Sequence, residues 1–258
     1  MILRHGGDAF VAPSVEERGI EDHDAAMQLI EQLERDEFDL LICMTAASLK
    51  FLRDIAVERD AVERMRTALR RVAIVSRGPK PLTILRPEKV PVAVVVPEPN
   101  TWREIVRAVA ERPERRVAVL EYGRSNLEMN TALEQLGAKV AAISLYRWTL
   151  PDDIGPLQEA ARRIASHQCD VALFTSSIQL DHLLRISRDL GIEDGVLTAL
   201  RDEVVVTSVG PIMTDTLVAR GITPDIIPQH PKMWAVVKTS AELAPQLLAQ
   251  RYGREVHR

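Results

Sequence analysis

Hydroxyl side chains stand at points where apolar, strand-like runs give way to helical segments. Thr45 follows one such run, and the triplet Thr175, Ser176 and Ser177 follows another. A hydroxyl at such a point caps the following helix, and the free backbone N–H groups of a helix N-terminus bind carboxylates and other anions. The two roles are compatible, so we expect Thr175, Ser176 and Ser177 to lie at a binding site, with helix capping alone as the alternative, and we include Thr45 among the candidate binding residues.

Two turns pair a serine with a glycine two residues later, Ser76 with Gly78 and Ser208 with Gly210. Each turn follows a β-branched run, at the carboxyl end of a predicted strand. Glycine has no Cβ, so it permits a ligand to approach the backbone closely. We therefore include these four residues among the candidate binding residues. The alternative is that they serve tight-turn geometry alone.

The candidate binding set is completed by residues near the other strand ends, four of which are positively charged. They are Arg77, Lys80, Tyr122, Gly123, Arg124 and Arg147. Most surface arginines are merely solvated, so the group carries more weight than any single member. Ligands of parallel α/β sheets bind at the carboxyl ends of the strands, which is where we expect the site.

Several kinds of active site lack their motifs in this sequence. The six histidines show no paired ligand spacing, which disfavours metal catalysis, and we expect no metal site. No Gly-x-Gly-x-x-Gly follows a strand, and no Gly-x-x-x-x-Gly-Lys-Ser/Thr is present. Dinucleotide and P-loop sites are therefore unsupported.

Composition excludes further classes of protein. The 258 residues include 33 Lys+Arg and 37 Asp+Glu, so the chain lacks the strongly basic footprint of a nucleic-acid binder. No apolar run approaches the ~20 residues of a membrane span, and Met1–Gly7 has no signal-peptide core. Cys43 and Cys169 are too few for a disulfide framework. We expect a cytoplasmic monomer that binds neither nucleic acid nor membrane.

Alternating strands and helices must position these residues. The runs Val72–Val75, Val92–Val96, Val117–Leu120 and Val204–Val206 have the composition of parallel strands buried on both faces. Segments with apolar residues at helical spacing lie between and around them, at 21–35, 46–59, 102–112, 127–136, 156–166, 178–190, 213–220 and 234–248. The alternation predicts an α/β fold with parallel sheets.

The two halves of the chain repeat each other. The segment Val72–Pro79 matches Val204–Pro211 at an offset of 132, and Trp102 meets Trp234 at the same offset. Upstream the offset is 131, which pairs Thr45 with Ser176 and the strand-like run before each. Two of three tryptophans in register indicate homologous half-chains.

Repeat one lacks the counterpart of the segment that opens repeat two. Extending the offset of 131 backward pairs Gly6 with Gly137, so Val117–Ala132 has no partner before Met1. Either the start has been placed too late, or one sheet lacks a strand. We expect the natural gene product to begin upstream with a strand, a turn and a helix, and this chain to have one domain with a strand fewer or partly disordered.

Taken together, these features resemble the uroporphyrinogen-III synthase family over essentially the whole chain. The resemblance rests on the order and spacing of Asp39–Leu52 and Asp170–Leu183, the duplicated Gly-Pro turns, and Leu136–Val140 leading to Tyr146-Arg147. It implies two doubly wound parallel-sheet α/β domains with exchanged topology, joined by two extended linkers, with the active site in the cleft between them. The implied parts are residues 1–14 with 151–258 as domain one, 19–144 as domain two, and linkers at 15–18 and 145–150.

The resemblance also implies a reaction. Hydroxymethylbilane, an open-chain tetrapyrrole with eight carboxylates, is cyclised to uroporphyrinogen III with inversion of the last pyrrole ring and loss of water. Such a lyase of haem biosynthesis needs no metal or cofactor. It must hold the chain ends together, assist departure of the hydroxyl and shield the cationic azafulvene. The candidate basic residues would face the acidic substituents of this partner.

Tyr146 is the candidate catalytic residue that the resemblance implies. It follows the strand Val140–Ile143 and matches a family tyrosine that points into the cleft, where it would donate a hydrogen bond to the departing hydroxyl. The alternative is a linker tyrosine that packs on a domain face. Where family members often carry Gly-Pro-Thr-Thr, this chain has Gly210–Thr214 with the sequence Gly-Pro-Ile-Met-Thr, and Pro81 occupies the matching hydroxyl position in the other repeat. These departures weaken the case for substrate contact by these turns.

Two other functions remain open. A catalytically weak tetrapyrrole-binding or regulatory module on the same fold is favoured by the absent strand and the lost threonines. A two-lobed small-molecule receptor would account for the duplicated domains, but no motif supports it.

Overall fold

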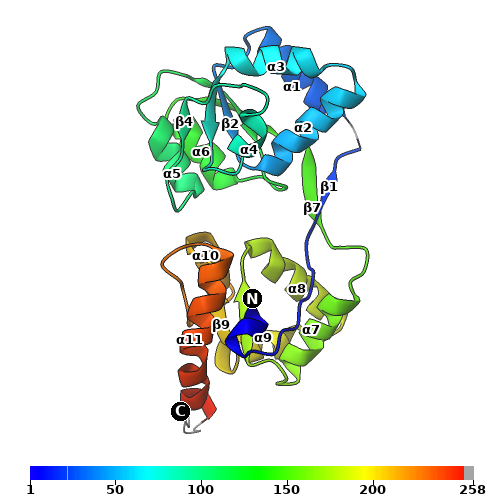
Figure 1. Cartoon of the computed structure of the whole chain (residues 1–258), viewed down its shortest axis with the longest axis vertical. Coiled ribbons are helices and arrows are strands. Elements are labelled where there is room, and N and C mark those ends of the chain that lie inside the picture. The colour runs from blue at the N-terminus through cyan, green and yellow to red at the C-terminus, as the bar shows by residue number, and fades with distance from the viewer. Residues whose placement is uncertain (22, 253–258) are drawn as a thin grey trace. The chain divides into compact units, whose positions relative to one another are not determined.

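The computed structural model describes residues 1–21 and 23–252, which form two compact units (Figure 1). Unit 1 comprises Met1–Glu16 and the chain from Leu150 to the end of the described residues, and unit 2 comprises Glu17–Thr149. Both boundaries fall inside the predicted linkers, 15–18 and 145–150. Residues 253–258, which the sequence assigned to domain one, lie outside the described residues.

Unit 2 is built on a parallel sheet with the strand order β4-β3-β2-β5-β6. Its strands are β2 (Leu40–Cys43), β3 (Ala73–Ser76), β4 (Val94–Val95), β5 (Arg116–Leu120) and β6 (Lys139–Ile143). Its helices are α1 (Asp24–Glu34), α2 (Ala46–Glu58), α3 (Val62–Arg71), α4 (Leu82–Leu85), α5 (Trp102–Val109) and α6 (Leu127–Gln135). The segments β1 (Glu16–Gly19) and β7 (Tyr146–Thr149) pair as a separate two-stranded sheet.

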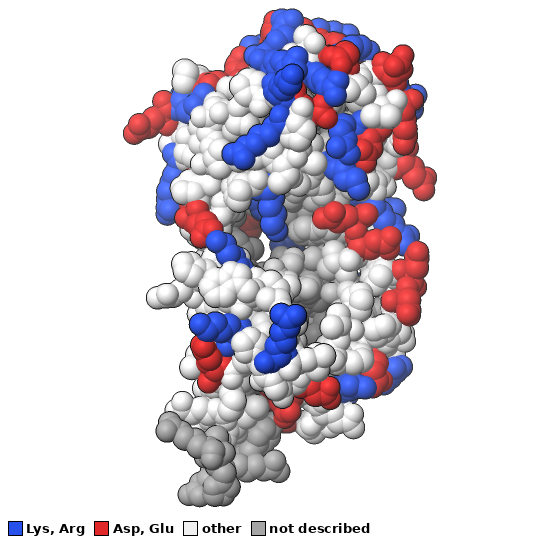
Figure 2. Space-filling model, in the orientation of Figure 1, with Lys and Arg blue, Asp and Glu red and all other residues white. Residues whose placement is uncertain are grey.

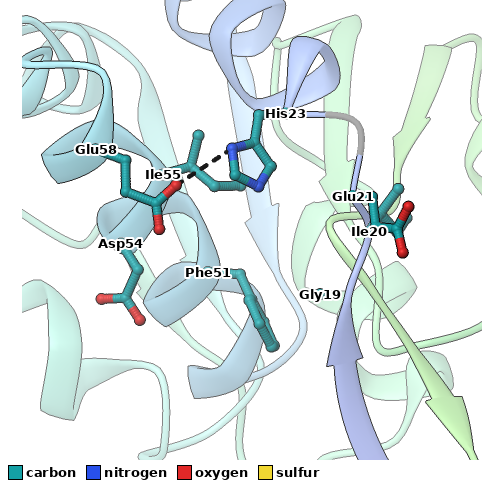
Figure 3. A pocket seen from close by; sticks show the side chains of 8 residues that line it. All are labelled: Gly19, Ile20, Glu21, His23, Phe51, Asp54, Ile55 and Glu58. Atoms are coloured by element: carbon teal, nitrogen blue, oxygen red, sulfur yellow. Dashed lines mark ion pairs between the residues drawn. The ribbon is translucent and has the colours of Figure 1, made fainter.

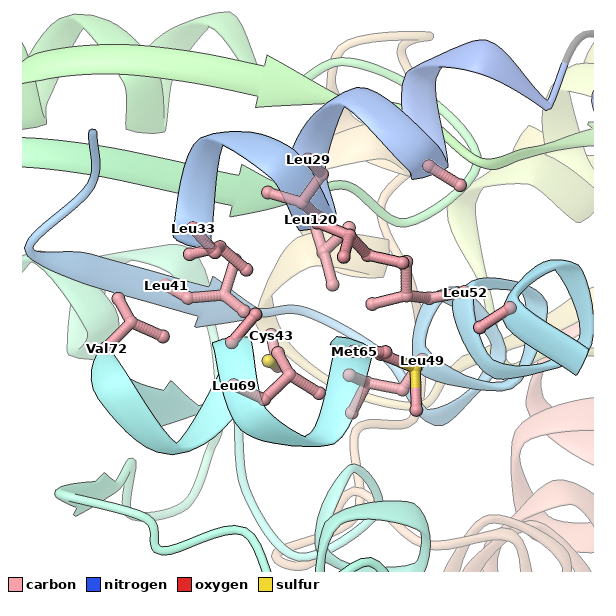
Figure 4. Packing of buried hydrophobic residues seen from close by; sticks show 14 of the residues in the cluster. Leu29, Leu33, Leu41, Cys43, Leu49, Leu52, Met65, Leu69, Val72 and Leu120 are labelled. Atoms are coloured by element: carbon pink, nitrogen blue, oxygen red, sulfur yellow. The ribbon is translucent and has the colours of Figure 1, made fainter. Parts of the chain in front are cut away.

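The central strands of unit 2 are apolar on both faces because helices cover both. On one face, Leu41 and Cys43 of β2 pack with α1, α2 and α3, as Figure 4 shows. On the other face, Leu40 and Ile42 pack with α5 and α6. Consecutive residues of a strand point to opposite faces, so an unbroken apolar run is what a strand between two helical layers requires.

Unit 1 repeats part of this arrangement around a smaller sheet. Its strands β8 (Val171–Phe174) and β9 (Val205–Ser208) are parallel, and an isolated parallel bridge joins Thr207 to Ile226. Its helices are η1 (Ile2–His5, a 3₁₀ helix), α7 (Gly155–Ala165), α8 (Ser177–Asp189), α9 (Glu193–Asp202), α10 (Pro211–Val218) and α11 (Met233–Tyr252). The main core of unit 1 lies among α7, α8, α9, α10 and the sheet.

The predicted repeat is present element by element. At an offset of 131 residues, α1, β2, α2 and α3 correspond to α7, β8, α8 and α9, with identical first and last positions, and β3 corresponds to β9 at an offset of 132. In unit 2, β2 pairs with β3 on one side and β5 on the other. Its counterpart β8 has a ladder partner on one side only, β9, among the strands of the described chain.

The sequence analysis missed the one-turn helices η1 and α4 and the longer helices α3 and α9. The helix α3 buries only Met65, Ala68 and Leu69 and is otherwise rich in arginine, so its apolar stripe is short. Its counterpart α9 contains Gly195, a poor helix former. The helix predicted at 21–35 begins at Asp24, and residue 22 lies outside the described residues. Of the strand predicted at Val92–Val96, only Val94–Val95 has strand structure.

Charged side chains of opposite sign are interleaved on the surface of unit 2. Figure 2 shows blue and red residues alternating over the end that carries α1 and α3. There Arg64 of α3 forms an ion pair with Glu34 of α1 at 2.7 Å, and Arg66 forms one with Glu88 at 2.5 Å. Among the described helices, none combines the length and apolar character needed to cross a membrane.

Candidate active site

The carboxyl edge of the unit 2 sheet brings together candidate residues from distant parts of the sequence. The strands β2, β3 and β5 end in register, with Cys43 opposite both Ser76 and Leu120. The chain therefore emerges at one edge at Thr45, Arg77 and Tyr122. This common edge is where parallel α/β sheets bind ligands.

Tyr146 packs against this edge from β7. Its ring stacks on Phe51 of α2, with 5.4 Å between the ring centroids and 16° between the planes. Its hydroxyl lies 3.1 Å from Thr45 Oγ1, and the residue is only 1% exposed. Burial raises the pKa of Tyr146 to about 12, against smaller opposing effects from the Thr45 hydrogen bond and from Arg77. The phenol therefore keeps its proton throughout the neutral pH range.

Thr45 is the N-cap of α2. Its backbone is extended, and its Oγ1 accepts the backbone N–H of Ser48 at 3.1 Å. Ser48 Oγ in turn donates to the Thr45 carbonyl at 3.0 Å. The cap holds the Thr45 hydroxyl at the N-terminus of α2, where it meets Tyr146. Capping and contact with the candidate catalytic residue are thus combined in one side chain.

A second group surrounds Tyr122 at the end of β5. The guanidinium of Arg77 lies 5.3 Å from the centre of the Tyr122 ring, and Trp148 of β7 contacts that ring edge-on, with centroids 5.4 Å apart. Asn126 Nδ2 donates to the Tyr122 hydroxyl at 3.3 Å. Burial lowers the pKa of Arg77, while Tyr122 and Tyr146 act in the opposite direction. A guanidinium has no accessible neutral form at physiological pH, so Arg77 places a positive charge beside both tyrosines.

The serine–glycine turns are occupied by their own hydrogen bonds. Ser76 Oγ donates to the Gly78 carbonyl at 2.7 Å, and Ser208 Oγ donates to the Gly210 carbonyl at 3.0 Å. Both serines are fully buried. These bonds support the alternative interpretation, in which the serines stabilise the turns.

The two glycines of these turns differ in conformation. Gly78 has φ +79°, and a Cβ there would lie 2.2 Å from Asn100 Oδ1, so the close approach is to Asn100. Gly210 has φ 166°, which is extended backbone. Thr214 Oγ1 donates to Ser208 Oγ at 2.9 Å, so the threonine that remains in this turn supports Ser208.

In unit 1, the hydroxyl triplet stands at the N-terminus of α8. Ser176 is the N-cap. The backbone N–H groups of Thr175 and Ser176 both donate to Gln179 Oε1, at 2.7 and 3.1 Å. Thr175 and Ser176 are partly exposed, whereas Ser177 is buried. The capping role predicted for this segment is confirmed, with Gln179 as the partner that sequence reasoning missed.

The remaining basic and turn residues lie around the Tyr122 group or on the open surface. Gly123 has φ +77°, and a Cβ there would lie 3.0 Å from the Trp148 ring. Arg124, in the same turn, is partly buried, whereas Lys80 and Arg147 are exposed. Within the described chain, the hydrogen bonds and ring contacts of the Tyr146 and Tyr122 groups do not include Lys80 or Arg147.

Sequence reasoning missed three residues that hold the candidate site together. Phe51 belongs to the apolar stripe of α2, and nothing in its spacing distinguishes it from a core residue. Trp148 is the tryptophan without a repeat partner, which was a usable signal. Asn126 is the N-cap of α6 and accepts the backbone N–H of Met129 at 2.9 Å, a position that helix-capping preference could have identified.

Within the described chain, no group of three His, Cys, Asp or Glu side chains is arranged to hold a metal ion. A cavity of about 340 Å³ lies in unit 2 between the end of β1 and α2, shown in Figure 3. Its polar lining includes His23 and Glu58, whose Nδ1 and Oε2 are 3.4 Å apart. Phe51, the stacking partner of Tyr146, also lines it. None of the predicted site residues lies in this cavity.

Comparison with known proteins gives consistent matches. The family model described as uroporphyrinogen-III synthase HemD matches residues 2–238. A Methanothermobacter thermautotrophicus protein provisionally named uroporphyrinogen-III synthase is 27% identical over 220 residues, covering 84% of this chain and 82% of that protein.

Solved structures share the fold. A mutant uroporphyrinogen III synthase from the extremely thermophilic bacterium Thermus thermophilus matches with a TM-score of 0.67 and 17% identity, covering 92% of this chain and 88% of that chain. Uroporphyrinogen-III synthetase from Helicobacter pylori matches with a TM-score of 0.53 and 15% identity, covering 92% and 96%. The predicted α/β fold with parallel sheets is therefore confirmed.

Proposed function

Since the chain belongs to the uroporphyrinogen-III synthase family, we propose that it cyclises hydroxymethylbilane to uroporphyrinogen III. The reaction inverts the last pyrrole ring and releases one molecule of water. It forms a carbon–carbon bond where a carbon–oxygen bond is lost, so the enzyme is a lyase. The protein must bind a flexible polyanion, help a hydroxyl group to leave, and direct the cation to the substituted carbon of the last ring.

The observation that carries this proposal is the contact between Tyr146 and Thr45 at the carboxyl edge of the unit 2 sheet. Departure of a hydroxyl group needs a proton donor, and general acid help contributes roughly 10²- to 10⁴-fold to rate. The Tyr146 phenol is protonated at neutral pH, as any tyrosine is, and burial raises its pKa further, so in the resting protein it can donate a proton but does not accept one. The 3.1 Å contact with Thr45 fixes its hydroxyl at the edge where ligands bind.

Positive charge near the same edge suits an acidic substrate. Arg77 has its guanidinium over Tyr122, and the N-terminus of α2 adds partial positive charge. In this proposal Arg77, Arg124 and Arg147 bind carboxylates of the tetrapyrrole. Charge-assisted hydrogen bonds of this kind are about twice as strong as neutral ones, which makes them suitable anchors for a flexible substrate.

The test is a coupled assay in which hydroxymethylbilane is made in situ and isomers I and III are separated by chromatography. Closure without inversion yields isomer I, so the fraction of isomer III measures the activity directly. We expect the purified chain to raise isomer III well above the no-enzyme control. Isomer I alone, at every protein concentration, would refute the proposal.

Arg77→Gln provides a second arm of this assay. It should raise KM more than it lowers kcat, because it removes a binding charge. Arg107→Gln is the matched control, since Arg107 is an exposed arginine of α5 in the same unit, with 74% of its side chain accessible. An Arg77→Gln variant with the KM of the control would remove Arg77 from the binding set.

A catalytically weak tetrapyrrole-binding module remains the second candidate. It is favoured by the small sheet of unit 1, in which β8 has one ladder partner among the described strands, whereas β2 has two. Binding of uroporphyrinogen III, measured by quenching of tryptophan fluorescence, without any isomer III production would support this candidate over the enzyme.

A further inference from the structure

Tyr146 and Thr45 differ in their access to a ligand. Tyr146 is 1% exposed, and its hydroxyl has one hydrogen-bond partner among the described residues, Thr45 Oγ1. Thr45 is partly exposed and lies at the N-terminus of α2. A ligand at the carboxyl edge would therefore meet the threonine hydroxyl, with the phenol behind it.

The hydrogen-bond donors in this group can be assigned from the contacts. Thr45 Oγ1 accepts the Ser48 N–H, and the Ser48 hydroxyl donates to the Thr45 carbonyl. The Thr45 hydroxyl proton then has two acceptors within reach, Ser48 Oγ at 3.2 Å and Tyr146 Oη at 3.1 Å. If Thr45 donated to Tyr146, the buried phenol proton would have no acceptor. Leaving a buried donor unsatisfied costs about 1–3 kcal/mol.

The favoured order is therefore Tyr146 to Thr45 to Ser48. In this order every hydroxyl proton of the group has an acceptor. The outermost proton, on Thr45, is held by the longest of the contacts, the 3.2 Å contact with Ser48 Oγ. It is the proton that an oxygen atom of a ligand can take over most easily.

We propose that Thr45 relays the proton of Tyr146 to the departing hydroxyl group of the substrate. This inference rests on the proposed function. As the carbon–oxygen bond breaks, both of its electrons stay with oxygen, which takes the Thr45 proton and leaves as water. In the same step Thr45 Oγ1 takes the phenol proton. When the macrocycle closes, the ring carbon that loses a proton gives it to Thr45 Oγ1, and Thr45 passes its own proton back to the Tyr146 phenolate, so the net change is loss of water.

The surroundings suit such a relay. A free threonine alkoxide is too basic to accumulate, so both protons must move together, and a fixed contact between the two hydroxyls makes this possible. Arg77 is the neighbouring charge that favours ionised Tyr146, and it opposes the effect of burial. Stacking on Phe51 holds the ring while its charge changes.

The test separates the relay from the helix cap. Thr45→Ser keeps both the hydroxyl and the cap, whereas Thr45→Asn keeps a good N-cap and removes the hydroxyl. We expect Thr45→Ser to retain kcat within a few-fold. We expect Thr45→Asn to lower kcat for isomer III by as much as Tyr146→Phe does, roughly 10²- to 10⁴-fold, with little change in KM.

Two further measurements exclude a merely structural effect. The double variant Thr45→Asn/Tyr146→Phe should lose no more activity than the worse single variant, because residues that act as a unit are not additive. Thr101→Asn is the control, since Thr101 is a threonine N-cap of α5 in the same unit, outside the proposed site. It should match Thr45→Asn in thermal stability and keep full activity.

Each outcome is decisive. If the wild-type chain makes no isomer III, the proposed function fails and the relay fails with it. If the wild type is active and Thr45→Asn retains its kcat, the relay alone is overturned. Additive losses in the double variant would also overturn it, because they would show that Thr45 and Tyr146 act independently.

Discussion

Replacing Tyr146 by phenylalanine should change the pH dependence of stability in a calculable way. Burial raises the pKa of Tyr146 to about 12, whereas tyrosine in an unfolded chain titrates near 10. Below about pH 10 the phenol is neutral in both states. Between about pH 10 and 12 only the unfolded chain releases the proton. The free energy of unfolding must then fall by about 1.4 kcal/mol per pH unit, roughly 3 kcal/mol in all.

The phenylalanine variant does not lose stability in this alkaline range, but its free energy of unfolding at neutral pH is lower than that of the wild type. At neutral pH, Tyr146→Phe keeps the stacking on Phe51 and loses the hydrogen bond to Thr45, which costs about 0.5–1.5 kcal/mol. The wild type should therefore be the more stable protein at pH 8. The two stability curves should cross near pH 11, where the alkaline loss of the wild type equals the missing hydrogen bond.

Urea denaturation followed by circular dichroism, at intervals from pH 7 to 11.5, measures both curves. The other titrating groups are common to both proteins, so their effects cancel in the difference. Curves that stay parallel up to pH 11 would refute the reasoning, since they would mean that Tyr146 ionises equally well in the folded and unfolded chains. Tyr122→Phe is a useful comparison, because Tyr122 is only partly buried.

Three further predictions concern groups away from the proposed relay. Burial raises the pKa of the Cys43 thiol to about 12. In a Cys169→Ser variant, Cys43 should therefore react with a disulfide reagent at pH 8 only as fast as the protein unfolds. Rapid stoichiometric labelling of Cys43 would contradict this prediction. Gly78→Ala should lower the free energy of unfolding, measured by urea denaturation, by about 1–3 kcal/mol more than Gly191→Ala does. Both glycines have positive φ, but only at Gly78 would the added Cβ clash with a neighbour, the Asn100 side chain. Equal losses in the two variants would show that the Asn100 side chain moves aside without cost. Asn126→Ala should cost about 1 kcal/mol of stability by removing the N-cap of α6, and Asn126→Asp, which can still cap, should recover most of it.

Much of the fold could be predicted from local sequence patterns. The apolar run at Leu40–Cys43 and its repeat at Val171–Phe174 are both strands; the first is buried on both faces, whereas Val171 and Leu173 of the second are only partly buried. The caps at Thr45 and Ser176 were predictable for a local reason, since a short hydroxyl side chain reaches the free N–H groups of its own helix. The arginine-rich helix α3 could not be predicted from local patterns, because its burial depends on the neighbouring helices α1 and α2.

The sequence by itself determined which residues stand at the ends of strands and that the two halves of the chain are copies. Both properties depend on residue type and spacing along the chain. Only the tertiary structure decided that Tyr146 meets Thr45, 101 positions away, and that Arg77 lies over Tyr122. It also decided that Ser76 and Gly78 serve their own turn and Asn100. Contacts between distant segments depend on the register of parallel strands and on the packing of side chains around them, which no local pattern encodes.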